Sequence, residues 1–216
     1  MDYVEQPLGA PATRTVEVIG IGRRFVAYLI DSIITTIVAW VVGFFLGLVF
    51  TISGGGPDQR GLLNLLAGGL GFLITAAYFV AFWSTTGQTI GNMMLGIKVI
   101  STEGEPLSFV GAILRYLGYI ISGLVLSFGF ASIAFDSKRQ GWHDKIANSY
   151  VVRKETEFSP REEVLVVPSD PGNGGVFLVL LYYGLICIIP LCIIALLTAL
   201  GPQIGNVFSE VNTNVP

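Results

Sequence analysis

Long apolar runs alternate along the chain with short polar segments. Three windows, each longer than the roughly 20 residues that a bilayer-crossing helix needs, contain no Asp, Glu, Lys or Arg. The first run begins ahead of its charge-free part and includes Asp31. The three windows predict spanning helices over residues 25–50, 62–83 and 176–200.

The fourth apolar segment, residues 107–135, permits two interpretations. It contains Arg115 and glycines, so it is either one long tilted helix or a broken pair of half-helices that returns to its starting side. Cytoplasmic segments carry an excess of Lys and Arg. A returning segment leaves ten of the other eleven such residues inside with the N-terminus and only Arg60 outside, whereas a single crossing leaves seven outside. This distribution favours the returning arrangement and a cytoplasmic N-terminus.

Two short stretches, residues 95–101 and 149–153, have the β-branched character of strands. We expect them to pair on the cytoplasmic face. The predicted fold class is therefore an all-α transmembrane bundle of three full spans plus a broken, re-entrant or interfacial helical segment, with a small cytoplasmic β-pairing. The predicted organisation, in chain order, is a polar N-terminal segment (1–19), a membrane domain (20–153), a charged flexible linker (154–175), a C-terminal transmembrane helix (176–200) and a short polar tail (201–216).

Composition agrees with a multi-pass membrane protein. Of the 216 residues, 52% are apolar and 12% are charged, whereas soluble domains are about 25% charged. The net charge of -3 offers no basic footprint for nucleic acid. A single histidine and two cysteines inside an apolar run predict no metal site, and no nucleophile or phosphate-loop motif is present. We therefore expect neither a cofactor nor an enzymatic activity.

Asp31 and Arg115 are the charges that interrupt the apolar segments themselves. A carboxylate within the membrane is costly unless it faces the bundle interior, where it pairs with a cation or lines a polar pathway. Arg24, seven residues before Asp31, is one candidate partner. We expect Arg115 instead, because the glycines around it permit close helix approach. Such a pair either only fixes helix packing or belongs to an ion-transport site.

A second polar cluster spans residues 136–145. One interpretation is a gate or ligand site made from Arg139, His143 and Asp144, in which His143 titrates near neutral pH. The other is an interfacial cap, in which the basic residues meet anionic lipid headgroups and Trp142 anchors at the interface.

Three motifs in this order resemble the RDD family of small prokaryotic membrane proteins. Residues 22–31 contain Arg24 and Asp31 in the positions of the family's arginine and first aspartate. Residues 86–99 resemble the central signature, except that Asn92 stands where a basic residue often follows the glycine. Residues 139–152 resemble the closing signature, with Asp144 as the second aspartate.

The resemblance implies a transport role, since some members of the family are linked to sodium/proton exchange. The charged positions and the motifs of the resemblance together give two sets of candidate site residues. The main constellation is Arg24, Asp31, Arg115 and Asp144, and the secondary set is Gln88, Arg139 and His143.

The C-terminal apolar segment is similar to the helix of small tight-adherence (type IVb) pilins. Tyr183-Gly-Leu-Ile186 and the short polar tail carry this likeness. Tyr182 stands where those pilins have a glutamate, and Phe177 stands at the expected cleavage glycine. A membrane anchor is therefore the simpler interpretation of this helix.

Two functions are compatible with these observations. The first is transport of an ion or small solute, with sodium/proton handling by an intramembrane carboxylate. The alternative is a non-catalytic scaffold that binds other membrane proteins through residues 176–200, or a second copy of this chain. Both place the protein in a prokaryotic cytoplasmic membrane, in contact with anionic headgroups.

Overall fold

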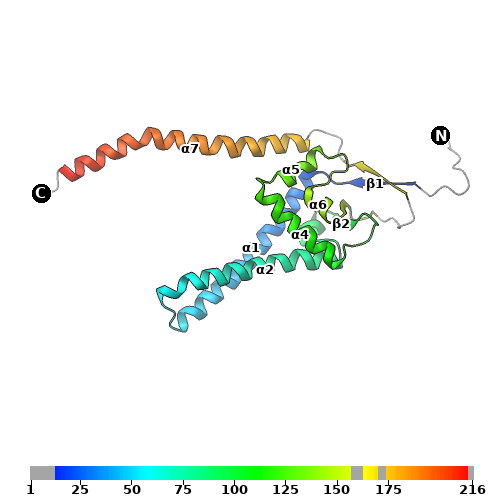
Figure 1. Cartoon of the computed structure of the whole chain (residues 1–216), viewed down its shortest axis with the longest axis horizontal. Helices are drawn as coiled ribbons and strands as arrows, with labels where there is room; N and C mark the ends of the chain where they lie inside the picture. The colour runs from blue at the N-terminus through cyan, green and yellow to red at the C-terminus, as the bar shows by residue number, and fades with distance from the viewer. Residues whose placement is uncertain (1–12, 157–162, 170–173, 214–216) are drawn as a thin grey trace, which may run out of the picture. The chain divides into compact units, whose positions relative to one another are not determined.

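The computed structural model describes residues 13–156, 163–169 and 174–213, and Figure 1 shows the path of the chain through them. The start of the predicted N-terminal segment, part of the predicted linker and the end of the tail lie outside these residues. The chain divides into two compact units, Met1–Gly175 and Val176–Pro216.

Among the described residues, three helices are long and apolar enough to cross a membrane. They are α1 (Ile21–Ile52), α2 (Arg60–Thr85) and α7 (Gly174–Thr213), and the short 3-10 turn η1 (Pro57–Gln59) joins the first two. At 1.5 Å per residue, the 32 residues of α1 exceed the thickness of the hydrocarbon core. The three predicted spans are therefore confirmed.

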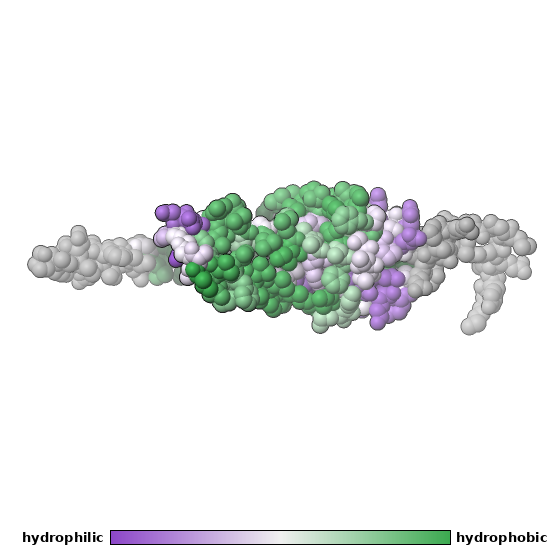
Figure 2. Space-filling view, turned by 90° about the horizontal axis from the view of Figure 1, so that it is seen from below, coloured by the Kyte–Doolittle hydropathy of each residue, from purple (hydrophilic) through white to green (hydrophobic). Residues whose placement is uncertain are grey.

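The long helices expose apolar side chains where a soluble protein would bury them. The apolar windows of α1 and α2 are only 6% and 11% buried, and Trp40 on α1 is 78% exposed. Figure 2 shows hydrophobic side chains covering much of the visible face, with hydrophilic side chains gathered toward its ends. A helix that is apolar all round needs lipid or protein as its solvent.

The segment 107–135 is a bent pair and not one straight helix. Helix α4 (Phe109–Leu124) and helix α5 (Phe128–Phe135) meet at a bend of 100°. Strand β2 (Ile97–Ser101) precedes the pair and strand β3 (Ser149–Arg153) follows it, and these strands are neighbours in one sheet. Both ends of the pair therefore lie on the same side, as the returning arrangement requires.

The sheet has four strands in the order β2-β3-β1-β4. The predicted pairing of β2 with β3 is confirmed: the strands are antiparallel, from Ile97 opposite Arg153 to Ser101 opposite Ser149. Strand β1 (Thr13–Val18) meets β3 at Val18, and strand β4 (Glu163–Pro168) runs parallel to β1. Strands β1 and β4 were not expected, because both are short and stand within polar segments.

The core of the first unit lies where α1, α2 and α4 meet one face of the sheet. Strand side chains alternate between faces, so Val99 and Val151 face these helices, and Ile100 and Val152 face the opposite side. The buried apolar side chains on the helix side are Ile19, Ala27, Phe79, Val80, Trp83, Ile97, Val99, Leu107, Ala112 and Val151.

Candidate functional site

Two arginines share one buried carboxylate beneath the sheet. Asp144 lies in the short helix α6 (Trp142–Ile146), and its side chain is fully buried. Arg24 Nη1 donates to Asp144 Oδ2 at 2.6 Å, and Arg115 Nη1 donates to Asp144 Oδ1 at 2.5 Å. The backbone N–H of Gly141 adds a 2.8 Å bond to Oδ2. The resulting triad joins α1, α4 and α6, which are distant in sequence.

Burial alone would raise the pKa of the Asp144 carboxyl. The attraction of Arg115 and Arg24 outweighs that penalty and holds the pKa of Asp144 well below its usual value. The carboxylate is therefore ionised throughout the physiological range, and the triad carries a net charge of about +1, since two guanidinium groups face one carboxylate.

Aromatic rings cover the Arg115 guanidinium. Its central carbon lies 5.1 Å from the centre of the Trp83 ring and 5.8 Å from that of Tyr119. Both distances are in the range of cation–π attraction. Arg115 also donates to Ser149 Oγ at 2.5 Å, which ties α4 to strand β3.

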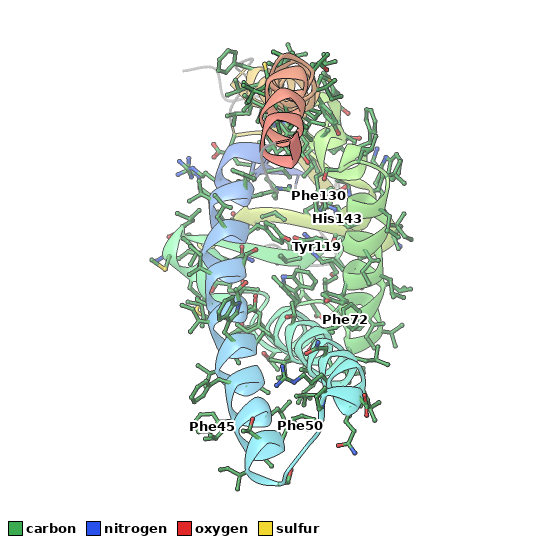
Figure 3. All side chains as sticks on the ribbon, turned by 90° about the vertical axis from the view of Figure 1, so that its left-hand side faces the viewer. Phe45, Phe50, Phe72, Tyr119, Phe130 and His143 are labelled. Atoms are coloured by element: carbon green, nitrogen blue, oxygen red, sulfur yellow. The ribbon has the colours of Figure 1, made fainter. Side chains whose placement is uncertain are left out.

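His143 is buried among aromatic rings, with its Nε2 3.4 Å from Asp144 Oδ2, and does not titrate near neutral pH. Its ring lies 4.5 Å from the Tyr119 ring and 5.0 Å from the Phe130 ring, and Figure 3 shows the three side chains close together. Burial lowers the pKa of His143 to about 3 against the attraction of Asp144. The expectation of a near-neutral titration was therefore wrong, because the ring lies in the protein interior. A Cβ at Gly118 would lie 2.7 Å from His143 Cα, so α4 approaches α6 this closely only with glycine there.

Asp31 occupies a second polar centre. Its carboxylate accepts hydrogen bonds from Tyr78 Oη at 2.7 Å, Thr89 Oγ1 at 2.6 Å and the Gly91 backbone N–H at 2.7 Å. Thr89 also caps helix α3 (Ile90–Met94) by accepting from the Asn92 N–H. Asp31, which is 2% exposed, therefore holds both α2, through Tyr78, and the start of α3 against α1.

The expected pair between Asp31 and Arg115 was wrong. Within the part of the chain that the structure describes, Asp31 makes no ion pair, and Arg115 pairs with Asp144. The bend between α4 and α5 returns the chain so that α6 lies against α4, which puts Asp144 within reach of Arg115. Three neutral donors already satisfy Asp31, so its charge is stabilised by hydrogen bonds.

A small cavity lies between the two centres. Its volume is about 20 Å³, against roughly 300–1,000 Å³ for a typical small-molecule pocket. It has room for about one water-sized guest. The charged side chains that line it are those of Arg24, Arg115 and Asp31, and the polar ones are those of Tyr28, Trp83, Thr89, Asn92 and Tyr119.

The remaining candidate residues lie outside this constellation. Gln88 donates to the Ile97 carbonyl at 2.7 Å, and Arg139 donates to the Ala134 carbonyl at 2.6 Å. Both side chains therefore stabilise the nearby backbone through these hydrogen bonds. The interfacial interpretation of residues 136–145 stays a prediction, and Trp142 is 38% exposed.

Sequence reasoning missed the neutral partners of the charged residues. Tyr78 and Thr89 satisfy Asp31, and Trp83 covers Arg115. A buried tyrosine hydroxyl usually has a partner, so Tyr78 in an otherwise apolar helix was a usable signal. Among the described residues, no group of three or more His, Cys, Asp or Glu side chains could hold a metal ion.

Comparison with known proteins matches the part of the chain that builds both centres. A family model described as the RDD family matches residues 18–148. This range contains Arg24, Asp31, Arg115 and Asp144 and ends before α7. No solved structure matches the chain.

The relatives are bacterial. Uncharacterized protein YxaI of Bacillus subtilis is 32% identical over 149 residues, which cover 62% of this chain and 97% of that protein. Uncharacterized membrane protein YteJ of the same species is 30% identical over 140 residues, covering 63% of this chain and 81% of that protein. The proline-rich antigen of Mycobacterium leprae is 33% identical over 91 residues, covering 39% of this chain and 36% of that protein.

Proposed function

The chain belongs to the RDD family of multi-pass membrane proteins, and we propose that it moves a small ion, with Asp31 as the carboxylate that binds and releases a proton. The proposal is non-enzymatic and requires no cofactor or metal.

The observation that carries the proposal is the setting of Asp31. It is a buried carboxylate on a membrane-spanning helix, without an ion pair in the described residues, and it lines the small cavity between the two polar centres. Ionisable groups at such positions are expensive and usually mark an ion or proton pathway. Two of its hydrogen-bond partners, Tyr78 and Thr89, are hydroxyls. A hydroxyl can accept as well as donate a hydrogen bond, so these two can rotate to suit either protonation state.

The cavity favours a proton over larger cargo. At about 20 Å³ it is too small for an organic solute. Arg24 and Arg115 line the same cavity, and their guanidinium groups present only hydrogen-bond donors where a sodium ion needs oxygen ligands. Sodium/proton exchange thus becomes the less favoured form of the proposal, and proton movement the more favoured.

The test is proton flux in vesicles that contain the purified full-length protein. Wild type should collapse an imposed pH gradient, and Asp31→Asn should reduce the rate to that of empty vesicles. Asp58→Asn is the matched control, because it makes the same chemical change at an exposed position in η1. Equal flux in Asp31→Asn and an active wild type would remove Asp31 from the pathway. Repeating the assay with and without a sodium gradient separates exchange from uncoupled proton movement.

A non-catalytic scaffold is the second candidate, and α7 is the observation that favours it. The apolar window of its span, Gly175–Gly201, is 6% buried, and the helix from Val176 onward belongs to the second compact unit. Such a helix needs lipid, a second copy of this chain or another membrane protein around it. A stoichiometric partner that is lost when residues 176–200 are replaced by an unrelated spanning helix, together with no flux in vesicles, would favour this role. The simpler role of α7 is that of a membrane anchor.

We also propose that the sheet faces the cytoplasm. Strands β1 and β3, the start of α1 and the segment after α5 meet at the sheet, and they carry most of the basic residues of the first unit. At the other end of α1 and α2, Arg60, the first residue of α2, is the one basic residue. Basic residues remain on the cytoplasmic side and meet anionic headgroups there.

A further inference from the structure

The local structure of the segment after α2 is repeated in the segment after α5. Helix α3 and strand β2 correspond to α6 and β3, each shifted by 52 positions, as Gly87 to Arg139 illustrates. The backbone has positive φ at Gly87 and Arg139, and again at Gly96 and Asn148. Over residues 87–101 and 139–153 only two aligned positions carry the same residue, Gln88 with Gln140 and Val99 with Val151.

The hydrogen bonds of the two copies correspond as well. Gln88 Nε2 donates to the Ile97 carbonyl at 2.7 Å, and Gln140 Nε2 donates to the Ser149 carbonyl at 3.1 Å. Each copy also bonds to the other in the same way. The Thr102 N–H donates to the Asn148 carbonyl at 2.9 Å, and the Lys154 N–H donates to the Gly96 carbonyl at 3.0 Å. Reciprocal bonds between equivalent residues are the property of a two-fold axis.

The axis passes through the cavity wall. Val99 lies opposite Val151 in the β2–β3 register, and these two residues are each other's equivalents. Both line the cavity of about 20 Å³. Internal repeats in membrane transporters commonly place their binding site at the repeat interface. The position of this cavity beside the axis thus agrees with a binding site.

Three side chains that line the cavity have an N–H group without a partner. Among the described residues, Arg24 Nη2, Arg115 Nε and Trp83 Nε1 have no hydrogen-bond partner. Side-chain exposure is 10% for Arg24, and residue exposure is 1% for both Arg115 and Trp83. A buried donor without an acceptor costs about 1–3 kcal/mol, and more if it is charged. The cavity is therefore rich in donors and suited to an acceptor.

The charges around the cavity decide which acceptor fits. Arg24 and Arg115 balance Asp144 and an ionised Asp31, so the four buried groups are neutral together and water suffices as the guest. When Asp31 takes up a proton, the group carries a net charge of about +1. An uncompensated buried charge is costly, and one monovalent anion in the cavity restores neutrality.

We propose that this cavity binds one small monovalent anion of halide size, and that the anion enters together with a proton on Asp31. One proton and one anion come from solvent, so the net charge of the core is unchanged. The inference rests on the proposed function only in taking Asp31 as a proton-binding group.

The titratable groups around Asp31 lie on helices α1, α2, α4 and α6. Helix α2 contributes Tyr78, which donates to Asp31, and the cavity that Asp31 lines is also lined by Arg115 and Tyr119 of α4 and by Arg24 and Tyr28 of α1. On α6, Asp144 pairs with both arginines, and the neutral His143 lies beside it. Helices α3 and α5 contain no titratable side chain. Asp144 is held ionised by both arginines and His143 stays neutral to about pH 3, so neither of these two groups couples anion binding to pH.

Bromide binding to the full-length protein in detergent tests the proposal. Trp83 lines the cavity, so replacing the more exposed Trp40 and Trp142 by phenylalanine leaves one tryptophan as a reporter. Bromide should quench Trp83 fluorescence with saturation, at an ionic strength held constant with gluconate. Between about pH 8 and about pH 5, a one-to-one coupling raises the bromide affinity by up to about tenfold per pH unit.

Variants on the same background separate the proposal from its alternatives. Asp31→Asn should bind bromide without a pH slope. Arg24→Gln should lose saturable quenching, whereas Arg23→Gln, a matched change at the neighbouring exposed position, should retain it. If Asp31→Asn does not fold, the wild-type slope and the two arginine variants carry the test.

Quenching that stays linear in bromide at every pH would overturn the proposal and leave water as the guest. Saturable quenching with no pH slope in wild type would also overturn it. These results are independent of the flux assay: proton flux without bromide binding refutes this inference alone, and bromide binding without flux refutes only the transport role.

Discussion

Replacing Asp144 by asparagine removes the one charge that Arg24 and Arg115 share. Asparagine retains a single acceptor oxygen, and its amide N–H groups face the guanidinium donors that now bond to Asp144 at 2.6 and 2.5 Å. Both arginines are then left as buried charges without a counterion, while α4 and α6 lose the bond between them. Breaking a buried pair by removing one partner costs about 3–5 kcal/mol.

The assay is thermal unfolding of the full-length protein in detergent. A change of 1 kcal/mol shifts Tm by about 2–4 °C for a chain of about this size, so Asp144→Asn should lower Tm by about 6–20 °C. Asp136→Asn is the matched control in the same segment. Asp136 pairs with Lys145 at 2.5 Å, but that lysine side chain is 52% exposed, and an exposed pair contributes about 0–1 kcal/mol. If Asp144→Asn lowers Tm no more than Asp136→Asn does, the triad does not stabilise the fold as argued.

Three further predictions follow from the same contacts. Between about pH 6.5 and pH 5, wild type should lose about 2 kcal/mol of unfolding free energy. In this range His143 takes up a proton in the unfolded state but not in the folded state, where its pKa is lowered to about 3. In unfolding curves measured at several pH values, His143→Gln should remove this pH dependence. Gly91→Ala should lower Tm and proton flux together, because a Cβ there would overlap the Ala27 carbonyl oxygen and lie 2.9 Å from Asp31 Cγ; an unchanged Tm would show that α3 is not held this tightly. Reporter fusions should place residues 53–59 and the end of the chain outside, and a reporter after residue 216 that is active only in the cytoplasm would contradict this orientation.

Hydropathy was sufficient to predict the long helices and the β2–β3 pair. Apolar runs of more than about 20 residues have few alternatives to a spanning helix, and α1 and α2 extend only a few residues beyond the predicted bounds. The charge distribution also favoured the returning form of residues 107–135. In the structure, the 100° bend between α4 and α5 and the pairing of β2 with β3 bring both ends of this segment to the same side.

The outer strands show where local patterns become ambiguous. Val16 and Val18 are fully buried and alternate with exposed positions in β1. Six alternating residues beside a helix of 32 are a weak signal, and β1 becomes a strand because β3 and β4 offer it hydrogen-bond partners. Strand β4 depends on the same long-range pairing.

The partner of Arg115 could not be predicted because it depends on topology. Helical spacing relates residues within one element, as with Arg24 and Asp31 on α1. The pairs that form join Arg24 and Arg115 to a five-residue helix that becomes their neighbour only after the chain has returned through the bend. Burial of Asp31 was correctly anticipated, but neutral donors could satisfy it as well as a cation could.

The internal repeat explains why the charges are distributed unequally over two similar halves. Its copies are preserved in backbone conformation and in backbone hydrogen bonds, which different residues can supply, so sequence identity is almost absent. Position 92 in the first copy is asparagine, and the equivalent position 144 is aspartate. Both arginines therefore bond to the second copy, and the surplus positive charge on that side is balanced across the axis by Asp31. A change of Asn92 to aspartate would add a carboxylate to the cavity wall and should remove any need for an anion there, so Asn92→Asp is expected to abolish saturable bromide quenching. Asn64→Asp, the same change on an exposed part of α2, should leave that quenching intact.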